Sequence, residues 1–351
     1  MEMAGRVALG IIGSLPLLIG ATLGSRSACS VAGAVIRNIN ALVRSRILRV
    51  AVARRCILAI SLVLCAGFTC GQQMAVTFDD LPVHGALPPG ITRLEIAQSI
   101  LKTVKREKMP AVYGFVNGGR GAEDPSSLSV LRAWRAARQP LGNHTWAHLD
   151  LNKESPEEFG AEVSKNEPLL EELMGKGDWH WLRYPYLHEG ETVEKRRAVR
   201  AWLFAHGYKI AQVSMDFEDY LWNEPYSRCV AKHDEKSIQK LHDSYLAVAD
   251  QYYRVFRELS QVVYGRDVKY VLLMHVGAFD ARMLPELLKL YRAKGVQFIS
   301  LEDAMSDPAY RDDPDIGEPA GGAFLELMMQ KKKLKFPANS KPYEELEAMC
   351  R

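Results

Sequence analysis

The stretch MAVTFDDLPVHG, residues 74–85, places two adjacent aspartates at the end of an apolar run. The run 74–78 has the length and composition of a buried strand. Asp79 and Asp80 are both expected to be ionised at neutral pH. A turn or a helix cap would explain the pair. A metal site would explain it equally well, with one carboxylate as a ligand and its neighbour moving a proton.

Further β-rich runs alternate with amphipathic helical patterns along the chain. The seven predicted strands are 74–78, 111–116, 140–145, 180–185, 209–215, 269–275 and 296–301. This alternation predicts parallel strands in an α/β, barrel-like fold. We expect a catalytic domain over 72–305, with a helical insertion at 220–268 before the sixth strand, and a C-terminal surface tail over 306–351.

Residues 1–71 are predicted to be a leader. Two arginines, Arg54 and Arg55, precede an apolar run of thirteen residues at 56–68, and small residues follow it. This is the layout of a secretory signal peptide. A second apolar stretch at 7–24 suggests that the true start codon lies near residue 50. We therefore expect export to the periplasm, the envelope or the medium; the alternative is a membrane anchor.

The net charge of +3 conceals two different regions. Eight arginines and one acidic residue lie in 1–71, which leaves 37 basic and 41 acidic residues and a net charge of −4 for the rest. The remainder therefore lacks the basic footprint of a nucleic-acid-binding protein, and no dedicated protein partner is evident. Beyond the leader only Cys229 and Cys350 remain, without a C-x-x-C pair, which argues against a cysteine zinc site. The two could form a disulfide if the protein is exported, although spacing alone cannot establish it.

Reactive side chains gather at the carboxyl ends of the predicted strands. They are Asp79 and Asp80 after the first strand, His144 and His148 at the third, Arg183 at the fourth, Asp216 after the fifth and His275 at the sixth. Active sites of α/β barrels are built at this end of the strands. Independent turns and caps would have no reason to gather there.

The sequence NHTWAH spaces His144 and His148 four residues apart, which lets both imidazoles converge on one point. Two imidazoles and the Asp80 carboxylate suit Zn²⁺ with one coordination position left for water. In extended geometry Asp79 points away from Asp80, which leaves it free to take the proton of that water. Two ordinary surface or core histidines are the alternative.

Three further groups each allow two interpretations. Arg183 could hold Asp79 ionised or form a surface salt bridge. His275 could be the acid that protonates a leaving amine or a satisfied core residue. Asp216 could tune His275 or cap the next segment. The aromatic residues Trp146, Tyr186 and Trp222 could likewise stack on a sugar ring or simply pack.

Five short motifs in this order resemble the polysaccharide deacetylase family, also called the NodB homology domain or carbohydrate esterase family 4. They are TFDD (77–80), HTWAH (144–148), RYPY (183–186), DFEDY (216–220) and LLMH (272–275). The resemblance spans roughly residues 74–301. It implies a distorted (β/α)₇ barrel and one divalent metal, usually Zn²⁺ and sometimes Co²⁺ or Ni²⁺.

The resemblance also assigns roles, carried over motif by motif. Asp80, His144 and His148 would be the metal ligands, Asp79 the base, His275 the acid, Arg183 the group that orients Asp79, and Asp216 the group that tunes His275. The implied reaction is hydrolysis of an N- or O-acetyl group of a glycan, with a backbone N–H near Tyr186 stabilising the oxyanion.

Departures from the family pattern leave the substrate open. Leu81 stands where many members have glycine, Val276 where an acidic residue is common, and the insertion at 220–268 is long. The substrate could be a chitin-, peptidoglycan- or xylan-like glycan. The alternatives are a related amidohydrolase that acts on a small non-sugar C–N bond, and a catalytically inactive glycan-binding module.

Overall fold

The computed structural model describes residues 71–82, 84–337 and 339–351. Apart from Gly71, the predicted leader lies outside the described residues. Seven strands form one sheet in which every pairing is parallel, which confirms the predicted α/β fold. The strands are β1 (Gln73–Leu81), β2 (Tyr113–Val116), β3 (Leu141–Asn143), β4 (Trp181–Leu182), β5 (Lys209–Ile210), β6 (Tyr270–His275) and β7 (Gln297–Phe298).

The sheet curls into a distorted barrel. Its strand order is β5-β4-β3-β2-β1-β6, and β7 pairs with the start of β1. The chain that continues from β5 then reaches the other edge, because Ser214 N and Met215 N donate to Val271 O and Leu273 N donates to Met215 O. Short strands and these few bonds complete the ring, so the strand ends face one common opening.

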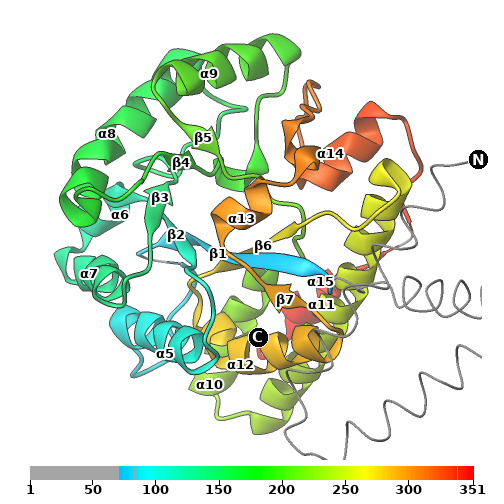
Figure 1. Ribbon diagram of the computed structural model, residues 1–351. Coiled ribbons are helices and arrows are strands. Elements are labelled where there is room, and N and C mark those ends of the chain that lie inside the picture. The colour runs from blue at the N-terminus through cyan, green and yellow to red at the C-terminus, as the bar shows by residue number, and fades with distance from the viewer. Residues whose placement is uncertain (1–70, 83, 338) are drawn as a thin grey trace, which may run out of the picture. The chain divides into compact units, whose positions relative to one another are not determined.

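Helices surround the curled sheet (Figure 1). The α-helices of the described residues are α5 (Arg93–Arg106), α6 (Gly118–Glu123), α7 (Leu128–Ala136), α8 (Pro156–Met174), α9 (Val193–Ala205), α10 (Asn223–Ala231), α11 (Glu235–Tyr264), α12 (Ala278–Ala293), α13 (Leu301–Met305), α14 (Phe324–Lys331) and α15 (Tyr343–Ala348). Short 3₁₀ turns lie at Pro125–Ser127, Pro185–Leu187, Asp219–Trp222 and Pro308–Arg311. Among the described helices, none has both the length and the apolar character that crossing a membrane requires.

Local sequence explains where the main elements begin. β1 is buried on both faces except at its first residue, as expected for a central parallel strand. Capping boxes start two of the helices: Thr92 with Glu95 at α5, and Ser155 with Glu158 at α8. Such caps typically stabilise a helix by about 1 kcal/mol.

The inside of the curled sheet is filled rather than open. Tyr113, Phe115 and Trp181 lie in it together with residues of α13, which packs against β1 and β6. The Arg183 guanidinium lies 4.6 Å above the Phe115 ring. This packed interior forms the floor on which the charged residues at the strand ends rest.

The chain after β5 differs in part from expectation. Helices α10 and α11 occupy the segment predicted as a helical insertion. The segment predicted as a surface tail contains α14, of which Phe324, Leu325 and Met329 are fully buried. An apolar helix of this kind packs into the core, so the last part of the chain is not merely a surface wrap. Cys229 in α10 and Cys350 form a disulfide, as the sequence allowed.

Candidate metal centre and active site

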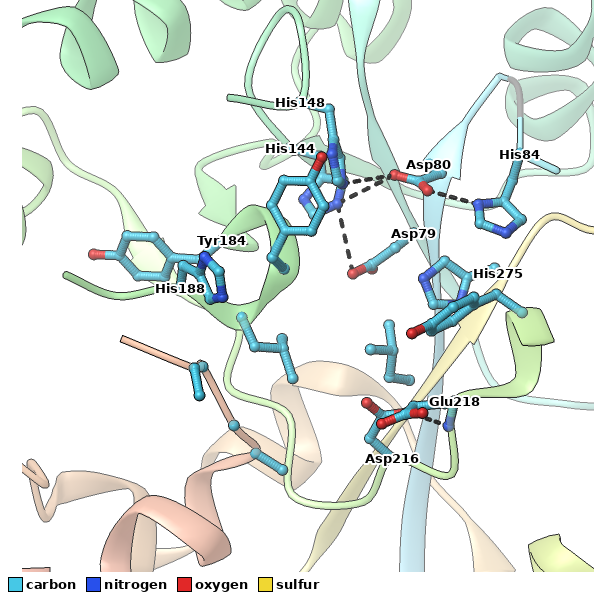
Figure 2. Close-up of a pocket in the computed structure, with 18 of the residues that line it drawn as sticks. Asp79, Asp80, His84, His144, His148, Tyr184, His188, Asp216, Glu218 and His275 are labelled. Atoms are coloured by element: carbon cyan, nitrogen blue, oxygen red, sulfur yellow. Dashed lines mark hydrogen bonds and ion pairs between the residues drawn. The ribbon is translucent and has the colours of Figure 1, made fainter. Parts of the chain in front are cut away.

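The predicted residues meet in one pocket at the carboxyl ends of the strands (Figure 2). Asp79 and Asp80 end β1, His144 and His148 follow β3, and His275 ends β6. All five line the pocket. The positional argument from sequence therefore holds for these residues, because parallel strands bring their carboxyl ends to the same edge.

Asp80, His144 and His148 offer three ligand atoms to one point. Nε2 of His144 lies 3.4 Å from Asp80 Oδ1, and Nε2 of His148 lies 3.1 Å from the same oxygen. Nδ1 of His144 must donate to the carbonyl of Arg183, 2.8 Å away, because a carbonyl only accepts. The Nε2 atom of His144 is thereby turned toward the Asp80 carboxylate.

The Asp80 Oδ1 atom has the surroundings of a metal ligand. It is buried and receives no hydrogen bond from any described residue, although two imidazole nitrogens lie beside it. Buried oxygens are normally satisfied, and ligand atoms gathered around an ion look like this when the ion is removed. The donor set of one carboxylate and two imidazoles fits a divalent cation such as Zn²⁺.

The electrostatics favour a negatively charged Asp80. Burial alone would raise the pKa of Asp80, but the three imidazole rings beside it, those of His144, His148 and His84, outweigh burial and hold the pKa well below its usual value. Burial lowers the pKa of His148, with help from the neighbouring His144. An ionised carboxylate beside a neutral imidazole is the protonation state that metal binding requires.

A bulge in β1 explains how both aspartates reach the pocket. The register of β1 against β2 shifts between Phe78 and Leu81, and Asp80 has φ +64°. Asp79 and Asp80 therefore both face the pocket, although they would point to opposite sides of a regular strand. His148 (φ +57°) and Tyr186 (φ +59°) adopt the same left-handed region. Each such residue costs about 1–3 kcal/mol, and strain of this kind gathers at functional sites.

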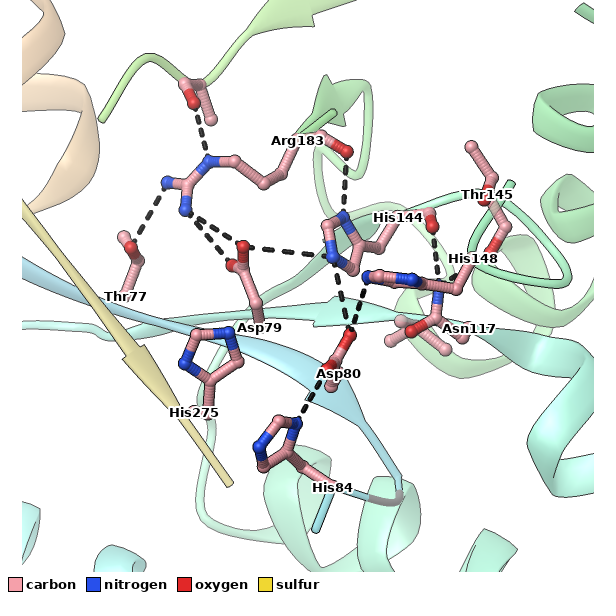
Figure 3. Close-up of polar contacts among 12 residues, drawn as sticks. Thr77, Asp79, Asp80, His84, Asn117, His144, Thr145, His148, Arg183 and His275 are labelled. Carbon is pink, nitrogen blue, oxygen red and sulfur yellow. Dashed lines mark hydrogen bonds and ion pairs between the residues drawn. The ribbon is translucent and has the colours of Figure 1, made fainter. Parts of the chain in front are cut away.

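Three buried asparagines fix the loop that carries the histidines. Asn117 donates to the carbonyls of His144 (2.5 Å) and Thr145 (3.1 Å), as Figure 3 shows. Asn143 Oδ1 accepts from Thr145 N, and Asn166 of α8 donates to the same oxygen. The sequence analysis missed these residues, since buried amides give no spacing signal.

Asp79 is paired with a buried guanidinium. Arg183 Nη1 donates to both carboxylate oxygens of Asp79, at 3.0 and 3.2 Å. The other guanidinium nitrogens donate to the Ala211 carbonyl and to Thr77 Oγ1, so the side chain is fixed on three sides (Figure 3). Arg183 is 1% exposed, which excludes the surface salt bridge considered from the sequence. The two hydrogen bonds fix the orientation of the Asp79 carboxylate.

His275 is oriented by Asp219 and not by Asp216. Its Nδ1 lies 2.7 Å from Asp219 Oδ1, and its backbone N–H donates to Asp219 Oδ2. The prediction that Asp216 tunes His275 is therefore wrong. Asp216 Oδ1 accepts a hydrogen bond from the backbone N–H of Glu218 and shapes a turn. Asp219, the second aspartate of the motif, faces the histidine instead.

A second buried carboxyl group lies behind Asp219. Asp280 of α12 accepts from Asn223 Nδ2 and from the Tyr245 hydroxyl. Burial raises the pKa of both Asp219 and Asp280 well above the usual value; the charge of Asp219 raises the pKa of Asp280 further, whereas hydrogen bonding with Asp280 lowers the pKa of Asp219 only in part. The pair therefore retains a proton at pH values where exposed carboxyls have lost theirs.

His84 is a pocket residue that the sequence analysis quoted but did not interpret. Its Nδ1 lies 2.7 Å from Asp80 Oδ2, and its ring centre lies 4.6 Å from that of His275. Asp80, His84 and His275 form a second group with ligand atoms close together. Burial lowers the pKa of His84.

The three aromatic residues predicted to stack on a sugar lie in three different environments. Tyr186 is 57% exposed and lines the pocket, with its ring centre 4.4 Å from that of His148. Trp146 lines a neighbouring hollow beside Arg93, and Trp222 is fully buried with its indole N–H donating to Ser244. Trp222 is therefore a core residue, because its ring packs among apolar neighbours, and Trp146 does not line the pocket around the metal ligands.

Late segments of the chain form the wall opposite the metal ligands. Residues 320–323 and Glu326 line the pocket with Glu218. Lys341 forms an ion pair with Glu218, and the Tyr343 hydroxyl donates to the same carboxylate. Burial raises the pKa of Glu326 to about 7. No sequence motif marks this wall.

The family model of polysaccharide deacetylases matches residues 67–209 of the chain. Over these residues the chain is similar to polysaccharide deacetylases, as its sequence motifs predicted. The match includes Asp79, Asp80, His144, His148 and Arg183, whereas Asp219 and His275 come after it.

Individual relatives agree with this family. The chain is 27% identical over 148 residues to a peptidoglycan-N-acetylglucosamine deacetylase from Bacillus cereus, covering 42% of this chain and 46% of the relative. It is 30% identical over 115 residues to a chitooligosaccharide deacetylase from Azorhizobium caulinodans, covering 33% and 48%. The chain thus spans about half the length of the curated relatives it matches. Among solved structures, the chitin deacetylase of Colletotrichum lindemuthianum aligns with a TM-score of 0.49 and 22% identity, over 68% of this chain and 88% of that chain.

Proposed function

We propose that this protein is a metal-dependent hydrolase that removes acetyl groups from an N- or O-acetylated glycan and releases acetate. The observation that carries the proposal is the convergence of Asp80, His144 and His148, with Asp79 on one side and His275 on the other. The match of residues 67–209 to the family model of polysaccharide deacetylases supports the same reaction.

Asp80, His144 and His148 would hold the metal, most simply Zn²⁺, with Co²⁺ or Ni²⁺ as alternatives. When bound, the metal would polarise the acetyl carbonyl and make a water molecule nucleophilic near neutral pH. The Nε2 atom of His144, turned toward Asp80, and the ionised Asp80 carboxylate are suited to this.

The chain's own groups would move the protons. Asp79, held by Arg183, would accept the proton of the attacking water. As the bond from the acetyl carbon to nitrogen or oxygen breaks, His275 would donate a proton to the leaving group. Asp219 would keep the Nδ1 side of His275 occupied, so that Nε2 performs the transfer. The backbone N–H of Tyr186 is the proposed donor to the oxyanion.

Acetate release tests the proposal. The metal-loaded protein is incubated with acetylated chito-oligomers, peptidoglycan and acetylxylan, with and without a chelator. We expect release from at least one substrate, its loss on chelation, and recovery when the metal is returned. Inactivity on all three would contradict the proposed function. Glycan binding retained by wild-type protein without turnover would favour the inactive binding module.

A smaller substrate is the second candidate, favoured by the wall at 320–326. This wall, with Tyr186 and Tyr220, narrows the space beside the metal ligands. It would suit an amide on a small molecule or at a chain end better than one in the middle of a polymer. The dependence of kcat/KM on oligomer length decides: a rise with length favours the polymer, and faster turnover of small amides favours the amidohydrolase.

Export is proposed with the function, since a glycan of the cell envelope would be met outside the cytoplasm. The Cys229–Cys350 disulfide supports this, because disulfides persist mainly in oxidising compartments. Sequencing the amino terminus of the exported protein would test it: a start just after the apolar run at 56–68 is expected, and retention in the cytoplasm would contradict it.

A further inference from the structure

We propose that His84 is a positioning residue that fixes the Asp80 carboxylate for metal binding and holds His275 in place on the other side of the pocket. This proposal rests on the proposed metal centre and concerns a residue outside the five motifs. Its basis is the hydrogen bond of His84 to Asp80 and its ring contact with His275.

The hydrogen bond assigns the two oxygens of Asp80 different tasks. Oδ2 lies 2.7 Å from His84 Nδ1, whereas Oδ1 faces the Nε2 atoms of His144 and His148. An ionised carboxylate only accepts, so His84 donates through Nδ1–H. Occupying Oδ2 in this way leaves Oδ1 as the ligand atom. Groups that hold ligating carboxylates typically change metal affinity by about 10–100-fold when removed.

His84 is itself held by the surrounding loop. Arg93 Nη1 donates to its carbonyl at 2.6 Å, and its side chain is 15% exposed. The next residue, Gly85, has φ +62°, and a Cβ there would lie 3.2 Å from the Cβ of Asn223. The loop therefore packs against the residue that bonds Asp280, which ties it to the support of His275.

Distances favour this role over a second metal ion at Asp80, His84 and His275. Two ligands bonded to one tetrahedral Zn²⁺ at about 2.0–2.1 Å lie roughly 3.3 Å apart. The separations on the side of His144 and His148, 3.4 and 3.1 Å, match this value. The 2.7 Å between His84 and Asp80 is the length of a hydrogen bond instead.

The ring contact extends the effect to the proposed acid. The His84 and His275 rings lie at 39° with centres 4.6 Å apart, and Asp219 occupies the Nδ1 side of His275. The His275 ring is thus bounded by a hydrogen bond on one side and by the His84 ring on another. His84 thereby connects the metal ligand to the proton donor.

Zinc affinity and stoichiometry of the full chain test the proposal. The variants are His84→Ala, His84→Asn, which keeps a donor N–H, and His188→Ala as a matched control. His188 also lines the pocket, is 17% exposed, and bonds the carboxylate of Asp150, which is not a predicted ligand. Affinity is measured by competition with a chromophoric chelator, and bound zinc by elemental analysis.

We expect one zinc per chain in every variant, a Kd raised about 10–100-fold in His84→Ala, substantial recovery in His84→Asn, and an unchanged Kd in His188→Ala. A Kd within threefold of wild type in His84→Ala would overturn the proposal. A stoichiometry of two zinc ions in wild type and one in His84→Ala would also overturn it, because His84 would then be a ligand of a second zinc ion. If His84→Ala does not fold, His84→Asn is compared with Asp80→Asn instead. A zinc Kd of His84→Asn as high as that of Asp80→Asn would overturn the proposal. These readouts do not need turnover, so a protein that binds zinc normally but releases no acetate contradicts the proposed function alone.

Discussion

The two sides of the pocket treat their carboxyl groups in opposite ways. On the metal side, the neighbouring imidazole rings overcome burial and lower the pKa of Asp80, and Asp79 is paired with Arg183. On the opposite side, burial prevails and raises the pKa of the carboxyl groups, namely Asp216, Asp219, Asp280 and Glu326. The first side is prepared to hold negative charge beside a cation, and the second to retain protons.

The two sides also come from different parts of the chain. The metal side is built from 77–80, 144–148 and 183, all within the part matched by the family model. The opposite side is assembled from His84, Asp219, His275 and 320–326, of which all but His84 follow the match. The proposed metal ligands therefore lie within the matched part of the chain, whereas the environment of the proposed acid is completed by segments that follow it.

Loss of a metal ligand should have the largest effect. Asp80→Asn removes the charge that faces His144 and His148, so we expect zinc binding to fall and acetate release to drop roughly 10³-fold or more. Chelation of the wild type should reproduce this loss. Turnover near the wild-type level in the variant, at equal zinc, would mean that the metal side is not the centre of the reaction.

Loss of the proposed acid should separate the two sides. His275→Asn should lower kcat on the order of 10²-fold while zinc stoichiometry and affinity stay near those of wild type. Acetate assays with parallel zinc titrations measure both quantities. If zinc affinity falls with kcat, His275 belongs to the metal side and the division of the pocket is wrong.

A smaller effect should distinguish the two candidate acids of the DFEDY motif. Asp219→Asn removes a carboxylate that accepts from the His275 N–H groups, so kcat should fall about tenfold. The pH–rate profile should shift as well, because His275 loses a charged neighbour. Asp216→Asn, whose carboxylate accepts from a turn N–H, should lose less and keep the profile. The reverse order would restore the assignment made from the sequence.

The smallest expected effect concerns the opposite wall and is a pH dependence of stability. The pKa of Glu326 is about 7 in the folded protein against 4.5 as its ordinary value. The folded state therefore binds the proton more tightly, and this contribution is complete below about pH 4.5 and lost as the pH rises through 7. The free energy of unfolding of wild type relative to Glu326→Gln should fall by about 3 kcal/mol over this window. Denaturant unfolding at several pH values measures it, and a flat difference would contradict the buried environment of Glu326.

Sequence reasoning reached the metal side but only part of the rest. The seven parallel strands and the roles suggested for Asp80, His144 and His148 follow from periodicity and spacing, which are local signals. The bulge that turns Asp80 beside Asp79 was not foreseen, because a register shift depends on the neighbouring strand.

Three errors share one physical cause, which is that long-range packing decides them. The choice between Asp216 and Asp219 depends on how the turn after β5 meets β6. Trp222 was predicted as a possible sugar-stacking residue, but packing against α10 and α11 buries it. The buried face of α14 packs on residues far away in the sequence, so its burial was not predicted. Spacing along the chain carries no information about these contacts.

The most direct measurement is anomalous diffraction at the zinc edge from crystals of the zinc-loaded protein. The account predicts one strong peak within about 2.0–2.2 Å of Asp80 Oδ1 and of Nε2 of both His144 and His148, with His84 Nδ1 still bonded to Asp80 Oδ2. No peak among these three residues, or a peak held by His84 and His275 instead, would contradict it.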